Sequence, residues 1–323
     1  MKKKKIVVIG GGTGTFTVLS GLKKYPVDLS AVVAMSDDGG STGILRDELG
    51  VLPPGDIRQC LVALSESPLF LRELMNYRFA EGKLSGHSFG NLLLSALEKM
   101  TGSFDEAVAR AGRILRIHGN VIPATLDKVN LAAHFTNGKV LRGQHKIQNA
   151  PLAMLSHLFL EPRAMANPKA LAAIREADLI TIGPGDIYSS LIPNLLVRGI
   201  PEAIRKSRAK KIYIVNLMTK LGQTEGFSVT DYARTIEHYL GEQFDHVIYN
   251  TKHPSPSLLA HYAGEGEHFV EIPKELPKTR FIGADLVNKK IFKTQKGDTL
   301  VRTLIRHDSD RLAHIVMPLA RKR

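Results

Sequence analysis

Short apolar runs alternate along the chain with longer stretches in which leucine and alanine recur at helical spacing. Each run ends in glycine or polar residues, which is typical of strands buried on both faces of a parallel sheet. The runs occupy residues 6–9, 27–35, 178–182, 212–215 and 246–249. Because strand-like and helical segments alternate, we predict an α/β fold with a Rossmann-like, doubly wound and mainly parallel sheet.

One long stretch departs from this alternation. Two strand-like runs, 129–135 and 140–146, flank Asn137-Gly138, the strongest short hairpin signal in a sequence. A helical, leucine- and alanine-rich segment precedes them. We therefore predict one Rossmann-like α/β domain over residues 1–323, with a helical and β-hairpin insertion at about 56–165.

The first strand runs directly into a glycine-rich turn, which we interpret as a phosphate-binding loop. Its members are Gly10, Gly11, Gly12, Thr13 and Gly14. Glycines let a phosphate approach backbone N–H groups, and the helix that follows offers the positive end of its dipole. A dinucleotide fingerprint would have a third glycine where Thr15 stands, so NAD is the weaker expectation for the ligand.

A second loop of this kind follows the strand at 178–182. It contains Gly183, Pro184 and Gly185, and Ser189 lies in the helix start behind it. Asn216 follows the next strand along the chain and could bond a base or a sugar. Ligands of open parallel sheets bind beyond the carboxyl ends of the strands, so we expect these groups to face one crevice. A Pro-Gly turn before a capped helix is the alternative reading.

Acidic residues form a third candidate group. Asp37 and Asp38 precede Gly39 at the end of the second strand, and Asp56 and Arg58 open a later helix. Adjacent carboxylates near a diphosphate repel it unless they bind sugar hydroxyls or a divalent cation. We expect Asp38 and Asp56 as ligands of Mg²⁺, with Arg58 clamping a phosphate. Helix capping is the alternative for the aspartates.

The segment 85–91 contains a literal G-x-S-x-G pattern. The polar stretch before it cannot be a buried strand, so it is no nucleophile elbow and acyl transfer is not expected. We interpret it as a loop entering a helix, with His87, Ser88 and Asn91 as ligand contacts. The chain also lacks H-E-x-x-H, Cys-x-x-Cys and a Walker lysine, which argues against zinc chemistry and P-loop hydrolysis.

The net charge of +13 suggests affinity for polyanions, but residues 2–5 and 321–323 supply seven of these charges and leave +6 elsewhere. Basic residues are not interleaved with aromatic ones, so specific nucleic-acid recognition is not expected.

The lone Cys60 cannot form an internal disulfide, which favours a reducing compartment. No stretch is long and apolar enough to span a bilayer. We expect a cytoplasmic protein.

The last third of the chain is harder to assign. A helical stretch that starts near Pro256 ends at Tyr262, and Arg306 stands just before a last helix capped by Asp308 or Ser309. If the chain folds back over the crevice, Tyr262 could stack on a base and Arg306 could donate a pair of hydrogen bonds to a diphosphate. An ordinary helix-end tyrosine and a solvated arginine are the alternative.

Five motifs in this order resemble the YvcK-like gluconeogenesis factors of bacteria, within the superfamily of CofD-type 2-phospho-L-lactate transferases. The motifs are Gly10–Gly14, Asp37–Ser41, Pro54–Arg58, Gly86–Asn91 and Gly183–Gly185. The resemblance implies a Rossmann-like fold and binding of a UDP-sugar such as UDP-N-acetylglucosamine or UDP-glucose. It also implies a regulatory role that links carbon metabolism to cell-wall synthesis and cell shape, with cell-wall synthesis proteins as partners and a homo-oligomer left open.

The same resemblance implies a second function. In the transferase branch, metal-binding aspartates match Asp37 or Asp38 and Asp56, so the alternative is a metal-dependent transferase. Here Pro54-Gly55-Asp56 replaces a more acidic pattern of that branch, and no general base is evident. A regulator without turnover is therefore the favoured expectation.

Overall fold

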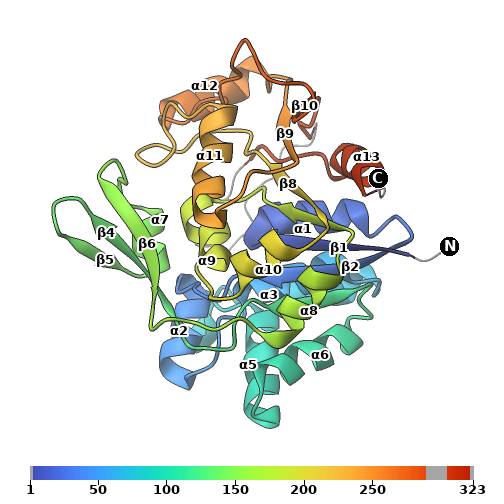
Figure 1. The fold of residues 1–323 in the computed structure, drawn as a ribbon. Helices are drawn as coiled ribbons and strands as arrows, with labels where there is room; N and C mark the ends of the chain where they lie inside the picture. Colours follow the sequence, from blue (N-terminus) through green and yellow to red (C-terminus); the bar gives the residue numbers. More distant parts are fainter. Residues whose placement is uncertain (1–2, 289–303, 321–323) are drawn as a thin grey trace.

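The computed structural model describes residues 3–288 and 304–320, and a seven-stranded parallel sheet forms its centre (Figure 1). The strand order is β10-β9-β8-β7-β1-β2-β3. The strands are β1 (Lys4–Gly10), β2 (Val27–Val33), β3 (Asn120–Pro123), β7 (Leu179–Ile182), β8 (Lys210–Ile214), β9 (His246–Asn250) and β10 (Phe281–Ala284). All five strands predicted from the apolar runs are present.

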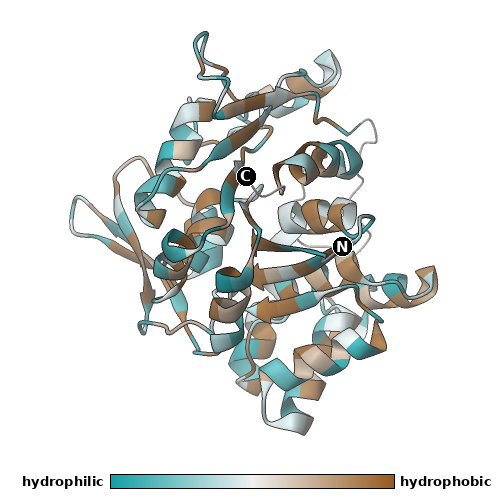
Figure 2. Ribbon diagram, turned by 45° about the vertical axis from the view of Figure 1, so that its right-hand side comes forward, coloured by the Kyte–Doolittle hydropathy of each residue, from teal (hydrophilic) through white to brown (hydrophobic). Residues whose placement is uncertain are grey.

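The sheet is buried on both faces, as the continuous apolar runs predict. Successive side chains of a strand point to opposite faces. In β1, Ile6 and Val8 pack into one core, and Val7 and Ile9 pack into the other. Figure 2 shows hydrophobic residues concentrated in these strands and on the helix faces against them. Burial on both sides explains why no polar residue interrupts the four-residue run of β1.

Helices cover both faces, so the sheet is doubly wound. One core contains residues of α1 (Gly12–Leu22), α3 (Gly55–Leu64), α5 (Phe89–Thr101), α6 (Phe104–Ile114) and α13 (Ser309–Leu319). The opposite core contains residues of α8 (Pro168–Glu176), α9 (Ile192–Leu195), α10 (Ile200–Lys206) and α11 (Val229–Leu240). The predicted α/β fold class is confirmed.

Four other helices within the described residues complete the connections between these elements. They are α2 (Gly40–Leu49), α4 (Leu69–Asn76), α7 (Gln144–Gln148) and α12 (Pro256–Gly264), with a 3₁₀ turn at Gly82–Leu84 and a π-helical turn at Ile187–Leu191. Because Phe89 begins a helix directly after a loop, the G-x-S-x-G segment is no strand-to-helix elbow, as expected.

The inserted region forms a second, antiparallel sheet beside the main one (Figure 1). It consists of β4 (Asn130–Phe135), β5 (Val140–Arg142) and β6 (Leu155–Glu161), and the turn at Asn137-Gly138 joins β4 to β5. The predicted second strand of the hairpin is too long, because the chain turns at Gly143 (φ 105°) and continues as α7. The sequence analysis also missed β3, which pairs with β2 as the edge strand of the main sheet.

The C-terminal part returns to the carboxyl edge of the sheet. The Tyr262 hydroxyl accepts hydrogen bonds from the backbone N–H groups of Leu304 (2.8 Å) and Ile305 (3.2 Å). His307 Nε2 contacts the carbonyl of Val215, just beyond β8, at 3.1 Å. Asp308 caps α13 as predicted, and its carboxylate accepts backbone N–H groups of the first turn. Two buried side chains therefore fix residues 304–307 over the sheet edge.

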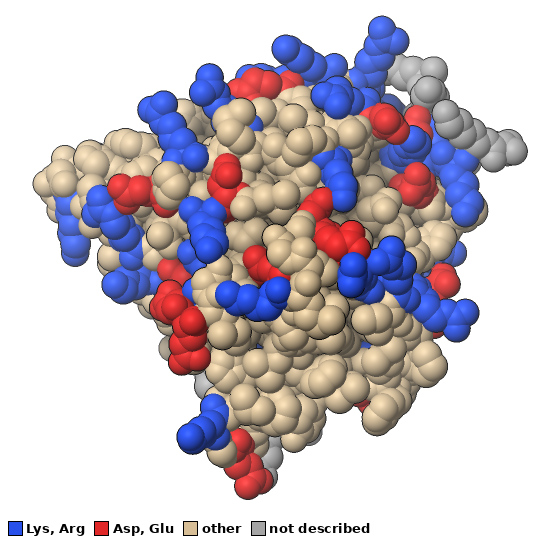
Figure 3. All heavy atoms as spheres, turned by 90° about the horizontal axis from the view of Figure 1, so that it is seen from below, with Lys and Arg blue, Asp and Glu red and all other residues tan. Residues whose placement is uncertain are grey.

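On the face that Figure 3 shows, basic and acidic side chains are interspersed and form no continuous patch of one sign. Lys2 and residues 321–323, whose positive charges the sequence analysis counted, lie outside the described residues. Within the described ranges, no helix is long and apolar enough to cross a membrane.

The contact between α1 and α13 gives a test of the packing. A Cβ atom added at Gly21 would lie 2.0 Å from the carbonyl oxygen of Ser309, whereas one added at Gly264 would meet no atom within 4 Å. We expect Gly21→Ala to lower the free energy of unfolding by about 1–3 kcal/mol, because the backbones cannot separate without loss of packing. Gly264→Ala, measured by the same urea titration, should stay within about 0.5 kcal/mol of wild type. Equal stability of the two variants would contradict this packing.

The buried imidazole of His307 gives a pH dependence. Burial lowers the pKa of His307 from 6.5 to about 4. The unfolded chain takes up this proton near pH 6.5 and the folded chain resists it, so stability falls as the pH drops from about 6.5 to about 4. We expect a loss of about 2 kcal/mol at pH 5 relative to pH 7.5.

Urea titrations at both pH values measure this loss. His307→Gln keeps an N–H donor for the Val215 carbonyl but does not titrate, so it should remove most of the pH dependence. His238→Gln, at an exposed position of α11, is the matched control and should retain it. The same pH dependence in all three proteins would show that His307 is not the responsible group.

Candidate functional site

A cavity of about 870 Å³ opens at the point where the strand order reverses. β1 lies between β2 and β7, so the loops that follow β1 and β7 diverge to opposite sides of the sheet. This is the position at which open α/β sheets bind ligands. The cavity is lined by fifteen predicted site residues: Gly11, Gly12, Thr13, Gly14, Asp37, Gly39, Asp56, Arg58, Asn91, Pro184, Gly185, Ser189, Asn216, Tyr262 and Arg306.

The two glycine loops lie in direct contact. The sequence analysis placed both at one crevice. A Cβ atom at Gly14 would stand 1.9 Å from the Pro184 carbonyl oxygen, so only glycine allows this approach. Gly12 (φ 63°) adopts a left-handed conformation at the start of α1. Asn216 accepts the N–H of Gly185 at 3.0 Å and thereby fixes the second loop. Asn216 therefore has a positioning role as well as a place on the cavity wall.

A carboxylate stands at the first glycine loop. Asp56 lies in the first turn of α3, and its Oδ2 would be 2.2 Å from a Cβ atom at Gly11. Pro54 is the cap residue of this helix, so the alternative reading of Asp56 as its cap is wrong. An anionic group beside a predicted phosphate-binding loop raises the cost of bringing in a diphosphate unless a cation or a proton accompanies it.

Asp37 and Asp38 have different surroundings. Asp37 lines the cavity, and desolvation raises its pKa, opposed by hydrogen bonds from the Gly39 N–H and from Thr42. Asp38 does not line the cavity; its two oxygens accept the backbone N–H groups of Gln144 (3.0 Å) and His145 (2.7 Å) at the start of α7. Asp38 therefore joins the insertion to the main sheet, which agrees with the capping alternative.

Arg58 belongs to a chain of polar contacts behind the cavity wall. Its Nε donates to Asn91 Oδ1 (3.0 Å), and Asn91 Nδ2 donates to the Ser41 hydroxyl (3.2 Å). Ser41 also contacts His87 Nδ1 at 3.0 Å. Because Arg58 is only 5% exposed, these contacts hold its guanidinium in place at the cavity.

Besides Asp38, four predicted residues lie beside the cavity without lining it. Ser88 is fully buried and caps α5 by accepting the N–H of Asn91, and His87 reaches the cavity only through Ser41. Gly10 and Gly183 form the strand ends that carry the two loops. These residues shape the site from behind it.

The structure adds cavity residues that the sequence analysis missed. The inserted helix α7 contributes Gln144, His145 and Gln148. Lys220, four residues after the predicted site residue Asn216, donates to Asp186 Oδ2 (3.0 Å) and to the Gln148 carbonyl (2.6 Å). Lys220 could have been found from its sequence position near a strand's carboxyl end, whereas α7 could not, because its helix depends on a cap from a distant residue.

Two hydroxyl groups of the cavity differ in availability. Tyr262 is 3% exposed and its hydroxyl holds the backbone of residues 304–305. Ser189 is 4% exposed, and its Oγ has no hydrogen-bond partner among the described residues. An orphaned buried hydroxyl is costly unless a ligand or water satisfies it. Ser189 is therefore well placed to bond a ligand between the loops.

Carboxylates slightly outnumber cations around the cavity. The carboxylates are Asp37, Asp56, Asp186, Glu265 and Glu267, and the cations are Arg58, Arg78, Lys220 and Arg306. Burial also raises the pKa of Glu267. Within the described ranges, no group of three or more histidine, cysteine, aspartate or glutamate residues could hold a metal ion. Mg²⁺ needs only one or two carboxylates when phosphates supply further ligands, so Asp37 and Asp56 fit a Mg²⁺ that arrives with a diphosphate.

Comparisons with known proteins agree with this architecture. A Thermotoga maritima protein described as a "putative gluconeogenesis factor" is 42% identical over 98% of this chain and 99% of its own length. A Bacillus subtilis protein described as a gluconeogenesis factor is 37% identical over 99% of each chain.

A crystal structure of a Bacillus halodurans protein has the same fold, with a TM-score of 0.89 and 37% identity over 98% of this chain and all of that one. Residues 6–291 match the family described as 2-phospho-L-lactate transferase CofD. The match includes both glycine loops and the acidic residues of the cavity. The chain therefore belongs to the CofD family, together with relatives described as gluconeogenesis factors.

Proposed function

We propose that this protein is a nucleotide-sugar-binding regulator that links gluconeogenic carbon metabolism to cell-wall synthesis and cell shape. Its ligand would be a UDP-sugar, with UDP-N-acetylglucosamine or UDP-glucose as the first candidates. The observation that carries the proposal is the cavity at the sheet reversal, which is lined by two glycine loops in contact.

The loops offer what a diphosphate requires. The start of α1, where the first N–H groups of a helix lack partners within the helix, lines the cavity together with Pro184 and Gly185. Pro184 has no N–H and the Gly185 N–H is bonded to Asn216, so α1 supplies the backbone donors. The free Ser189 hydroxyl adds a donor between them. A volume of about 870 Å³ is large enough for a ligand of nucleotide-sugar size.

Other parts of the cavity suit the base and the sugar. Tyr262 lines the cavity and its hydroxyl is already bonded, so only the part of its ring on the cavity wall can contact a base. Asp37 accepts hydrogen bonds and lines the cavity, which suits a carboxylate that binds sugar hydroxyls. Relatives described as gluconeogenesis factors support the metabolic role. Cell-wall synthesis proteins as partners, a cytoplasmic location and self-association are parts of the proposal.

A metal-dependent transferase of the 2-phospho-L-lactate type is the second candidate. The observation in its favour is that Asp37 and Asp56 line the cavity that contains the phosphate loop. Mg²⁺ between such carboxylates and a diphosphate would neutralise charge on the transferred group, and Arg58 and Arg306 would orient it. The regulator is favoured because the carboxylate of Asp38, one of the two expected metal ligands, is engaged with α7.

Calorimetry with UDP-N-acetylglucosamine, UDP-glucose, GDP and NAD tests the ligand. We expect a UDP-sugar to bind at least about 10-fold more tightly than GDP or NAD, a difference of roughly 1.4 kcal/mol. Millimolar or weaker binding of all four compounds would refute the proposal. Transfer of the phospholactyl group from a nucleotide-activated 2-phospho-L-lactate to the hydroxyl of an alcohol acceptor, with release of the nucleoside monophosphate, would favour the transferase instead.

Removal of Mg²⁺ tests the charge argument. Since carboxylates outnumber cations in the cavity, EDTA should weaken UDP-sugar binding by about 3- to 10-fold. Asp56→Asn removes the charge beside Gly11, so its binding should depend much less on Mg²⁺. Asp47→Asn, at an exposed position of α2, is the matched control and should behave as wild type. The same effect of EDTA on wild type and on Asp56→Asn would show that Asp56 does not contact the ion.

A further inference from the structure

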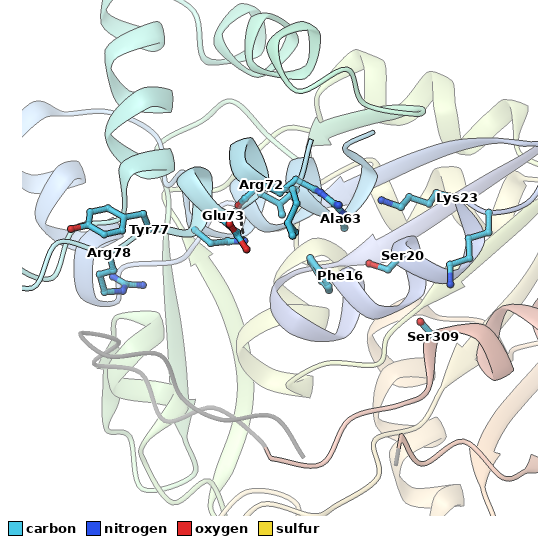
Figure 4. Close-up of a pocket in the computed structure, with 13 residues that line it drawn as sticks. Phe16, Ser20, Lys23, Ala63, Arg72, Glu73, Tyr77, Arg78 and Ser309 are labelled. Atoms are coloured by element: carbon cyan, nitrogen blue, oxygen red, sulfur yellow. Dashed lines mark hydrogen bonds between the residues drawn. The ribbon is translucent and has the colours of Figure 1, made fainter. Parts of the chain in front are cut away.

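A second cavity of about 600 Å³ borders α4, and neither the motifs nor the proposed function uses it. Its walls come from α1, α3, α4 and the start of α13 (Figure 4). α3 and α4 follow each other in the sequence, but α1 and α13 are distant from them, so the cavity is a product of tertiary packing.

Cations dominate the polar lining of this second cavity. Lys23, Lys24, Arg72 and Arg78 line it, against the single carboxylate of Glu73. Lys24 is paired with the exposed Asp310 at 2.5 Å. The excess of positive charge in a concave space favours an anion.

Two of these cations, Lys23 and Arg72, repel each other, although the Glu66 carboxylate opposes part of the effect on Lys23. Lys23 Nζ donates to the Ser65 carbonyl (3.0 Å). Figure 4 shows the Arg72 side chain directed toward Lys23. Burial, reinforced by the charge of Arg72, lowers the pKa of Lys23. Arg72 Nε is buried and has no hydrogen-bond partner among the described residues. An anion seated here would relieve the repulsion and satisfy the orphaned donor.

The rest of the wall is apolar. Phe16, Val62, Ala63 and Leu69 line the cavity, and Leu69 is 62% exposed. An exposed leucine at the rim of a basic cavity offers a contact that an inorganic ion would not use. The lining therefore suits a small molecule with an apolar body and a charged end. Because arginine forks match phosphate geometry and cations remain in excess even with Lys24 paired to Asp310, a phosphate is favoured as the charged end.

We propose that this cavity is a second ligand site, which binds a small organic phosphate with an apolar body. Arg72 and Lys23 hold the phosphate, and Phe16, Val62 and Leu69 contact the apolar part. The site is distinct from the glycine-loop cavity, although Arg78 lines both and Asn76, at the end of α4, accepts a hydrogen bond from Arg58.

Calorimetry with 1-naphthyl phosphate, inorganic phosphate and 1-naphthol tests the site. We expect 1-naphthyl phosphate to bind at least about 10-fold more tightly than either of the others, because only it engages both halves of the lining. Arg72→Gln should weaken its binding at least about 10-fold. Arg175→Gln, at an exposed position of α8, removes the same charge elsewhere and should leave the affinity unchanged.

A second variant tests the site independently of any structural effect of Arg72→Gln. Ser20→Leu leaves every charge in place but fills the cavity from α1, so it should also weaken binding of 1-naphthyl phosphate. Thermal melts establish that each variant is folded. Binding that is equal in wild type, Arg72→Gln and Ser20→Leu, or inorganic phosphate that binds as tightly as the ester, would overturn the proposal.

The experiment separates this site from the proposed function. Arg72 does not line the glycine-loop cavity, so Arg72→Gln should bind UDP-N-acetylglucosamine as wild type does. Saturating UDP-N-acetylglucosamine should leave an Arg72-dependent site for 1-naphthyl phosphate. If no UDP-sugar binds but the Arg72-dependent binding remains, only the proposed function fails. If the UDP-sugar displaces the ester and Arg72→Gln has no effect, only the second site fails.

Discussion

The approach of Gly14 to the Pro184 carbonyl is the constraint on which the rest of the site depends. It brings together two loops that belong to opposite halves of the sheet. Any larger residue at position 14 would force them apart, and the cavity walls on both sides would move with them. Asn216 and Asp186 then fix the second loop from the neighbouring β8 side, through the Gly185 N–H and the Lys220 ammonium.

Electrostatic balance in the cavity is set by groups that already have partners. Arg58 is tied to Asn91, Lys220 to Asp186, and Asp37 to Gly39 and Thr42. Such groups are preorganised, so little side-chain entropy is lost when a ligand enters. The carboxylate of Asp56 lies beside Gly11 in the first glycine loop, and its charge is the reason why a cation is expected to enter with a phosphorylated ligand.

Local sequence patterns predicted the parts of the molecule that local physics determines. The apolar runs located five strands, Asn137-Gly138 located a hairpin, and Asp308 located the start of α13. The glycine loops were found for the same reason, since a turn from strand to helix has a local signature. In contrast, β3 is only four residues long and owes its conformation to pairing with β2.

Long-range contacts account for what local patterns could not predict about the site. Asp38 was expected to bind a cation, but its oxygens are occupied by N–H groups of residues more than a hundred positions away. Tyr262 was expected to contact a base, and its placement in the cavity depends on the return of residues 304–305. The second cavity has no motif, because its four helices meet only in the folded chain.

The central position of β1 has a consequence for the order of folding. Its partner β7 pairs Ile6 with Leu179, so the middle of the sheet closes only after the whole intervening chain is available. Contacts of such sequence separation slow folding, since the loop entropy is lost before the pairing compensates for it. During synthesis, β1 and β2 can pair early, while the other edge of β1 stays open until β7 emerges. The reversal of strand order at β1 creates the ligand site. It also leaves the apolar strand β1 with one unpaired edge in the nascent chain, and such an edge is prone to aggregation until β7 pairs with it.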